Sequence, residues 1–224
     1  MKRSLKSLFS LIALSSLTLA STQSLASTAS VAEIGLNKGQ SINLVLPIQS
    51  SAQNYTAGSL DITVNGTSFL AFCIDPFQYA SHSALTYTSY SDLNTLGSSA
   101  AVVSNLYSQS YASTLGNATN SAAFQLALWD LAKDDGVLTT GGVHTTNSTN
   151  TTVAAAANSM IYNAQHSSGS TQYSFNLYTN GNKQDYLVAS VTAVPEPETY
   201  AMLLAGLGLM GFTVRRRRQS AIGY

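Results

Sequence analysis

The stretch that decides the fold is LDITVNGTSFLAFCI, residues 60–74. Two runs of apolar and β-branched residues flank Asn65-Gly66. This pair predicts a hairpin, because both residues tolerate the positive φ of a type I′ turn. Apolar side chains occupy both faces of the second run, which indicates a strand buried on both sides at its end. Asp75-Pro76 ends that strand, since proline lacks the N–H that a ladder needs.

The segments around this hairpin predict further strands and three helices. Upstream, strands are expected at 31–36 and 41–49. Apolar residues at three-to-four spacing predict helices at 92–107, 121–133 and 152–164, with Asn120 or Ser121 as cap of the second. A loop is expected at 138–152, between the second and third helices. After the third helix, closing strands are expected at 173–178 and 185–194 around Asn180-Gly181. The order predicts an α+β domain, a β-sandwich or barrel-like sheet core with an inserted helical subdomain.

Charge and composition favour an exported protein. The ten Lys and Arg residues balance ten Asp and Glu residues, yet only 9% of the chain is charged and 45% is hydrophobic. Segment 27–194 has eight acids and three lysines, so its charge is −5, and it has no basic stripe. That argues against nucleic acid as a partner. Ser and Thr number 56, so uncharged hydrogen-bonding groups build the surface.

The first residues have the order of a secretory signal peptide. Lys2, Arg3 and Lys6 precede an apolar run at 8–19, and Ser24-Leu25-Ala26 is a small-x-small cleavage site. Cleavage after Ala20 or Ala29 is an alternative. A twelve-residue run is too short to span a bilayer, so we expect a signal peptide at 1–26 and a mature domain at 27–193.

The C-terminal end has three parts. Pro195, Glu196 and Pro197 precede an apolar run at 200–214, and four arginines follow it: Arg215, Arg216, Arg217 and Arg218. The positive-inside rule would retain the arginines on the cytoplasmic side, so this segment is expected to form a single transmembrane helix that holds the body outside the inner membrane transiently.

Segment 194–218 resembles the PEP-CTERM sorting signal of Gram-negative bacteria, and residues 219–224 form a short tail beyond it. The resemblance implies recognition by an exosortase-type transpeptidase, removal of the tail, and delivery to the cell surface or the extracellular matrix of a biofilm.

Cys73 is the only cysteine of the chain, so an exported protein would carry it without an internal disulfide partner. It ends a strand in the segment Phe72-Cys73-Ile74-Asp75. The segment 124–129, FQLALW, lies on the second predicted helix. An unpaired buried cysteine is commonly a small hydrophobic core residue, and that interpretation stays open.

These two segments resemble the thioester domains of bacterial surface adhesins, in which an aromatic-Cys-hydrophobic-acid segment and a Gln-x-Ala-hydrophobic-Trp segment supply a Cys–Gln thioester. The resemblance implies a cross-link between Cys73 and Gln125. It departs from the family where Phe124 stands in a position that is often Thr. The residues expected around the bond are Phe72, Asp75, Phe124, Ala127, Leu128 and Trp129.

A thioester is a stored electrophile that must be screened from water, and the apolar residues around Cys73 and Gln125 suit that task. Asp75 or Asp130 could move a proton, although a strand-end cap and a helix-face residue are equally compatible with them. His82 could act as a base. The three histidines His82, His144 and His166 show no metal-ligand spacing, so no metal or other cofactor is expected.

Two functions follow from the sequence. The first is covalent, single-use attachment to an amine- or hydroxyl-bearing surface or matrix component, which is adhesion and not enzymatic turnover. The alternative is a non-reactive structural or polysaccharide-associated protein of the biofilm matrix, with Cys73 in the core.

Overall fold

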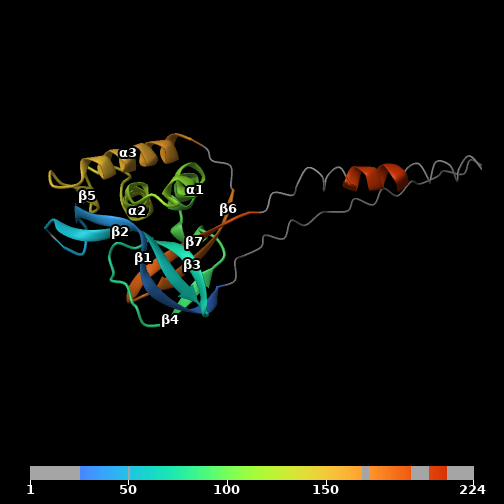
Figure 1. Cartoon of the computed structure of the whole chain (residues 1–224), viewed down its shortest axis with the longest axis horizontal. Helices are drawn as coiled ribbons and strands as arrows, with labels where there is room; N and C mark the ends of the chain where they lie inside the picture. The colour runs from blue at the N-terminus through green and yellow to red at the C-terminus, as the bar shows by residue number, and fades with distance from the viewer. Residues whose placement is uncertain (1–25, 50, 168–171, 193–201, 211–224) are drawn as a thin grey trace, which may run out of the picture.

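A computed structural model describes residues 26–49, 51–167, 172–192 and 202–210 of the chain. It confirms the α+β class: an antiparallel sheet carries three α-helices that are inserted between its strands in the sequence (Figure 1). The predicted signal peptide lies outside the described residues except for Ala26.

All strand pairings in the described part of the chain are antiparallel. The strands are β1 (Ser27–Val45), β2 (Gln53–Val64), β3 (Thr67–Cys73), β4 (Leu85–Tyr90), β5 (His144–Thr145), β6 (Tyr173–Asn180) and β7 (Lys183–Val191). The first residues of β1 pair with β4, residues 31–44 pair with β2, and Leu44 and Val45 pair with β5. The pairings therefore close a ring in the order β1-β2-β3-β7-β6-β4, which is the predicted barrel-like core.

The helices lie together on one side of the sheet (Figure 1). They are α1 (Ser99–Thr114), α2 (Ala118–Lys133) and α3 (Thr151–His166). Helix α2 is central, because it packs against both other helices and against β1 and β2. Its eleven consecutive residues from Ser121 to Leu131 are all buried. A helix that is buried all round needs partners for its polar side chains, and α2 has three of them inside: Ser121, Gln125 and Asp130.

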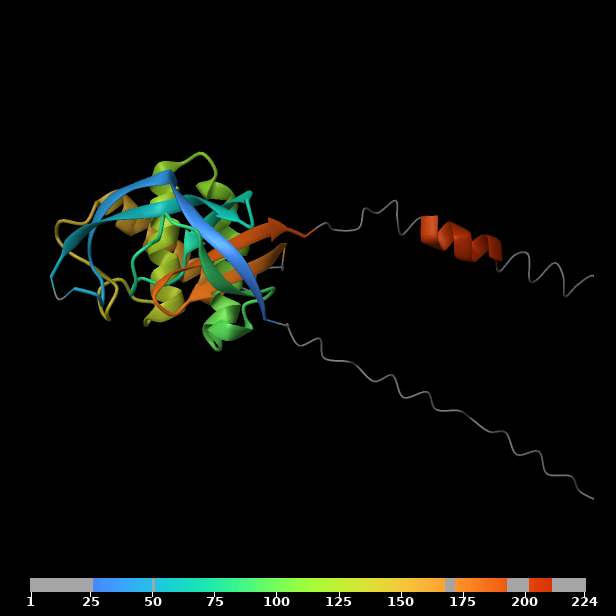
Figure 2. The same cartoon turned by 90° about the horizontal axis from the view of Figure 1, so that it is seen from below.

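The two predicted upstream strands are one long strand. The prediction of a break between 36 and 41 was wrong, since β1 runs through the polar segment Asn37–Gln40, whose first two residues are exposed, while it stays paired with β2. Register shifts at Glu33/Gly35 and Leu36/Lys38 mark bulges, which bend a strand without ending it. Figure 2 shows this bend in the blue ribbon of β1. The strand ends two residues before Pro47, and the predicted strand had extended to 49.

The first helix lies further along the chain than predicted. Residues Asn94–Leu96 form a 3-10 turn, and Gly97 interrupts the segment with φ 57°, so α1 begins at Ser99 and ends at Thr114 instead of spanning 92–107. Helix α2 is capped by Asn117, whose side chain accepts from the N–H of Asn120, so the predicted cap, Asn120 or Ser121, was three or four residues late. The third helix and the closing hairpin are confirmed.

Strand β4 was not predicted, because it is polar except at its ends and at the buried Tyr87. The loop predicted at 138–152 is confirmed except that His144 and Thr145 form the short strand β5 and that α3 already begins at Thr151.

The Asn65-Gly66 turn has the backbone that the sequence predicts. Asn65 has φ 50° and Gly66 has φ 83°, which are the two positive values of a type I′ turn. The turn sets the register that pairs Leu60 with Ala71 and so positions the end of β3.

We expect Gly66→Ala to destabilise the domain by about 1–2 kcal/mol, because a side chain in the left-handed region clashes with its own backbone. Urea unfolding measures this free energy. The control is Gly181→Ala in the β6–β7 turn, where φ is not positive and an added Cβ would meet open space. That variant should change stability by less than about 0.5 kcal/mol. Equal losses in the two variants would contradict the turn assignment.

Candidate functional site

The structure brings Cys73 and Gln125 together. The backbone N–H of Cys73 donates to Oε1 of Gln125 at 2.9 Å, and Nε2 of Gln125 donates to the carbonyl of Cys73 at 2.6 Å. The Gln125 side chain is 1% exposed and Cys73 is 4% exposed. The carboxamide that the sequence pairs with the thiol is therefore held, in one orientation, by the backbone of the residue that bears the thiol.

The local topology explains why the amide lies there. The β2–β3 ladder ends at the Leu60–Ala71 pair, and on the other side of β3 the N–H of Ile74 donates to the carbonyl of Asp185. Because hydrogen-bonding direction alternates along a strand, the backbone groups of Cys73 face the side that β2 has left. Gln125 supplies the two hydrogen bonds of the missing rung.

Ser121 performs a similar task one helical turn earlier. Its hydroxyl accepts from the N–H of Ser59 at 2.8 Å and donates to the carbonyl of Lys38 at 2.8 Å. Residues four apart share a helix face, so Ser121 and Gln125 both reach the sheet from α2. Ser121 bonds the paired residues Lys38 of β1 and Ser59 of β2, whereas Gln125 bonds the end of β3.

An aromatic cluster supports this junction. Phe72 and Phe124, each directly before one residue of the pair, lie with ring centroids 4.6 Å apart. Tyr107 of α1 meets Phe124 edge-on at 4.9 Å, and Tyr111 meets Phe72 at 6.2 Å. All four rings are buried. The predicted surroundings Phe72, Phe124, Ala127, Leu128 and Trp129 are likewise buried.

Cys73 also borders a cavity of about 390 Å³. Trp129 lines the same cavity. Cys73 therefore lies between this space and the packed core. Polar and aromatic groups of the cavity wall come from separate parts of the chain, among them Glu33, Tyr55, Thr56, Gln78, Tyr79, His82 and Gln184. Sequence reasoning singled out His82 and missed the others, since no local pattern links β1, the segment after β3 and β7.

The electrostatics keep the free thiol protonated. Burial raises the pKa of the Cys73 thiol well above its ordinary value, and the negative charges of Glu33 and Asp75 raise it further. A thiolate is therefore not the resting form, so the thiol proton must leave during any attack by sulfur.

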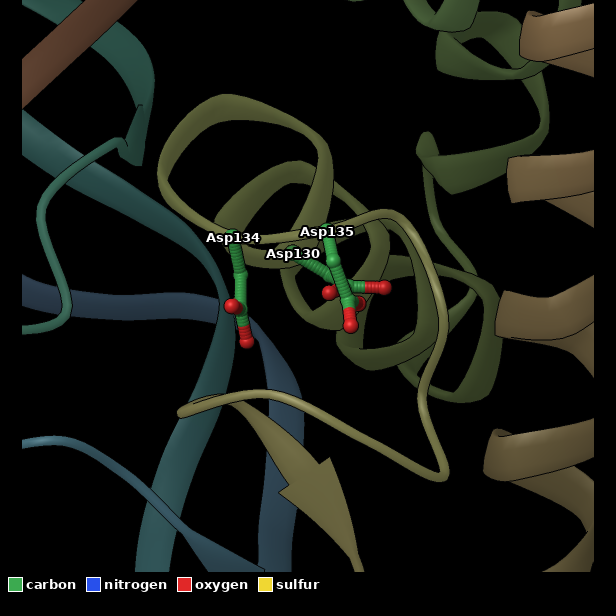
Figure 3. A group of neighbouring side chains, drawn as sticks. All are labelled: Asp130, Asp134 and Asp135. Atoms are coloured by element: carbon green, nitrogen blue, oxygen red, sulfur yellow. The ribbon is translucent and has the colours of Figure 1, made fainter.

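Of the three suggested proton carriers, one caps a strand end. Asp75 accepts from the N–H of Phe77 at 2.8 Å, which is the cap geometry that the sequence left open. His82 lines the cavity, and its Nδ1 lies 3.3 Å from the carbonyl of Glu33. Asp130 lies elsewhere on α2, grouped with Asp134 and Asp135 (Figure 3).

Asp130 is buried and neither of its oxygens has a hydrogen-bond partner among the described residues. Burial raises its pKa to about 7, and the charges of Asp134 and Asp135 act in the same direction. Nearby N–H groups of Gly136 and Val137 lower the pKa without reaching hydrogen-bonding geometry. The sequence analysis expected no metal site and missed this cluster, whose only signal is the spacing of 130, 134 and 135.

The comparisons with known proteins identify the C-terminal segment. Residues 193–218 match the family model of the PEP-CTERM protein-sorting motif, which confirms the predicted resemblance. The motif implies export, surface association in Gram-negative bacteria and processing by an exosortase-type enzyme. Its Pro-Glu-Pro and arginine residues lie outside the described residues.

Residues 202–210 of the predicted transmembrane segment are helical, and the rest of the apolar run lies outside the described residues. Within the described chain, no helix is both long and apolar enough to cross a membrane.

Several solved structures are similar to the chain. The N-terminal thioester domain of a surface protein from Clostridium perfringens has 12% identity and a TM-score of 0.46, over 74% of this chain and 100% of that one. The N-terminal domain of the Streptococcus pyogenes pilus tip adhesin Cpa has 11% identity and a TM-score of 0.43, over 75% and 94%. The Bacillus anthracis TIE protein has 16% identity and a TM-score of 0.43, over 75% of this chain and 32% of that one. No curated protein matches the chain.

We expect Gln125→Ala, made in a Cys73→Ala background where no thioester can form, to lower the free energy of unfolding. The buried N–H and carbonyl of residue 73 would lose their partners, at about 1–3 kcal/mol for each group. Thermal and urea unfolding measure the loss. Gln165→Ala is the control, because that half-buried amide donates one bond, to the carbonyl of Gly136. A loss no larger than the control's would show that the two bonds are absent.

Asp185, whose carbonyl anchors Ile74, should make stability depend on pH. Burial raises its pKa from 3.8 to about 6; the N–H of Asn180 and the charge of Lys133 lower it, and Asp75 raises it. The folded state then holds this proton more tightly than the unfolded state, so stability falls as pH rises from about 4 to about 6. Asp185→Asn keeps an oxygen acceptor for Asn180 and should remove this part of the slope. Parallel stability–pH curves for the variant and the parent protein would contradict the shift.

Proposed function

We propose that the body of this protein is a covalent attachment module that stores a thioester between Cys73 and Gln125. The carrying observation is the reciprocal hydrogen bonding of the Gln125 carboxamide with the Cys73 backbone, inside the molecule and beside a cavity. This geometry holds the amide carbon next to the residue whose sulfur would attack it, which removes most of the ordering cost of the reaction.

In the formation step, Sγ of Cys73 attacks Cδ of Gln125 and the C–N bond breaks. The thiol proton goes to the departing nitrogen, which leaves as ammonia, so a protonated thiol is the right starting form. The N–H of Cys73 donates to Oε1, where negative charge develops in the tetrahedral intermediate, and it therefore stabilises that charge. No cofactor or oxidant is needed for this balance.

In the attachment step, an external amine or hydroxyl attacks the acyl carbon and the C–S bond breaks. The nucleophile's proton goes to the sulfur, which becomes a free thiol again. Loss of ammonia leaves the Cys73 carbonyl without the donor that it had, so this carbonyl can accept from an incoming N–H or O–H. Phe72, Phe124 and Trp129 limit the access of water to the bond.

The reaction consumes the thioester, so each molecule reacts once and the protein is not an enzyme. The sorting motif supports an attachment reaction at the cell surface, because the motif implies surface association. We propose adhesion to a partner cell, a host surface or the biofilm matrix, after transient retention in the inner membrane and processing by an exosortase-type enzyme. The signal peptide at 1–26 and the domain at 27–193 belong to this proposal.

Intact-mass measurement tests the function directly. The thioester makes the mature chain lighter by one ammonia, and methylamine should add to Gln125 and release one thiol. Cys73→Ala should show neither effect. Ser59→Ala, which keeps the backbone bond to Ser121, is a control that should keep both. A full unmodified mass with a Cys73 thiol that methylamine does not change would refute the proposal.

One observation favours a second candidate function. The Gln125 amide completes the strand edge by hydrogen bonding alone, so the junction would also serve a non-reactive structural or polysaccharide-associated matrix protein with Cys73 in its core. The mass measurement separates the two, because only the reactive protein loses ammonia.

A further inference from the structure

A cluster of three acidic side chains lies at the C-terminal end of α2, separate from Cys73. Asp130, Asp134 and Asp135 each offer one carboxylate oxygen, and these oxygens lie within 4.8 Å of one another. Figure 3 shows Asp130 on the last turn of α2 and Asp134 and Asp135 where the chain leaves the helix. Such spacing allows a single ion to contact all three carboxylates.

Asp130 is the member of the cluster whose carboxylate lacks a hydrogen-bond partner in the described structure. It is fully buried, and the lack holds for both of its oxygens. A buried carboxylate without donors is costly, so such groups are protonated, paired with a cation or bound to a metal. One of its oxygens lies within 4.8 Å of an oxygen of each of the other two acids, so one cation could contact all three.

The dipole of helix α2 also favours a cation at this position. The last turn of a helix carries the negative end of the macrodipole, where cations are favoured and acids are not. Here the helix ends at Lys133, Asp130 is in its last turn, Asp134 is its C-cap and Asp135 follows. A cation at this place would neutralise both the carboxylates and the exposed carbonyl end of α2.

The neighbouring loop is already organised around two of the acids. Asp135 accepts from the N–H of Val137 at 2.9 Å and from the hydroxyl of Thr140 at 2.8 Å. Asp134 accepts from the N–H of Val143 at 2.6 Å. These bonds fix the two carboxylates, so they need little ordering on binding, and Asp130 is the member whose oxygens remain to be satisfied.

We propose that Asp130, Asp134 and Asp135 bind a calcium ion that pins the loop 136–143 to the end of α2. Carboxylate oxygens are the donors that hard cations prefer, and Ca²⁺ accepts irregular sets of six to eight oxygens, with water completing the shell. Mg²⁺ demands a stricter octahedron and is the weaker candidate. This inference does not depend on the thioester.

Terbium luminescence tests the site without relying on stability. Trp129 is the only tryptophan and directly precedes Asp130, so a terbium ion at the cluster should be sensitised by its excitation. Added Ca²⁺ should quench the signal by displacement, with one ion per chain and a dissociation constant in the range of about 10⁻⁴–10⁻³ M that extracellular modules show. Mg²⁺ should displace terbium only at higher concentration.

Variants complete the test on the chelator-treated full chain. Ca²⁺ should raise the melting temperature of the parent protein and of Asp61→Asn, a control at a distant carboxylate that pairs with Asn37. Asp130→Asn should lose both the shift and the terbium signal, and Asp135→Asn is the second variant should the first fail to fold. An absent calcium effect, an equal effect in the variants or a preference for Mg²⁺ would overturn the proposal.

Discussion

The junction of sheet and helices depends on one side-chain amide that replaces a rung of a β-ladder. Where β2 leaves β3, Gln125 gives the N–H and carbonyl of Cys73 the partners that a strand would have given them. Helix α2 is thereby locked to the sheet at a defined depth and rotation. The same two bonds hold the Gln125 carboxamide beside the cysteine, so the feature that stabilises the fold is also the one that would organise its chemistry.

Burial sets the electrostatic character of the domain. A chain with few charges places several of them inside, and for Cys73, Asp130 and Asp185 burial is the main cause of a raised pKa. In each case the neutral form is favoured. For the thiol, this agrees with a reaction in which the proton departs with ammonia. For Asp130, it means that either a proton or a cation must compensate the carboxylate.

Helix α2 connects the two sites. Ser121 and Gln125 on one part of the helix complete the sheet edge, whereas Asp130 at its end faces the loop that follows. Because eleven consecutive residues are buried, α2 cannot move without disturbing both neighbouring helices and the sheet. An ion bound at its end would therefore act on the same rigid body that presents Gln125 to Cys73.

The sequence by itself determined what short-range physics controls. The Asn65-Gly66 turn, the end of β3 at Asp75-Pro76 and the helical character of α2 depend on residues close together in the chain, and all are found in the structure. The Cys73–Gln125 pairing was predicted from two segments 52 residues apart, because a resemblance linked them. Only the tertiary structure decided that β1 continues through its polar middle, that α1 begins after Gly97, and that Glu33 lines the cavity beside Cys73. Those outcomes depend on partners distant in sequence, whose hydrogen bonds and packing override local propensity.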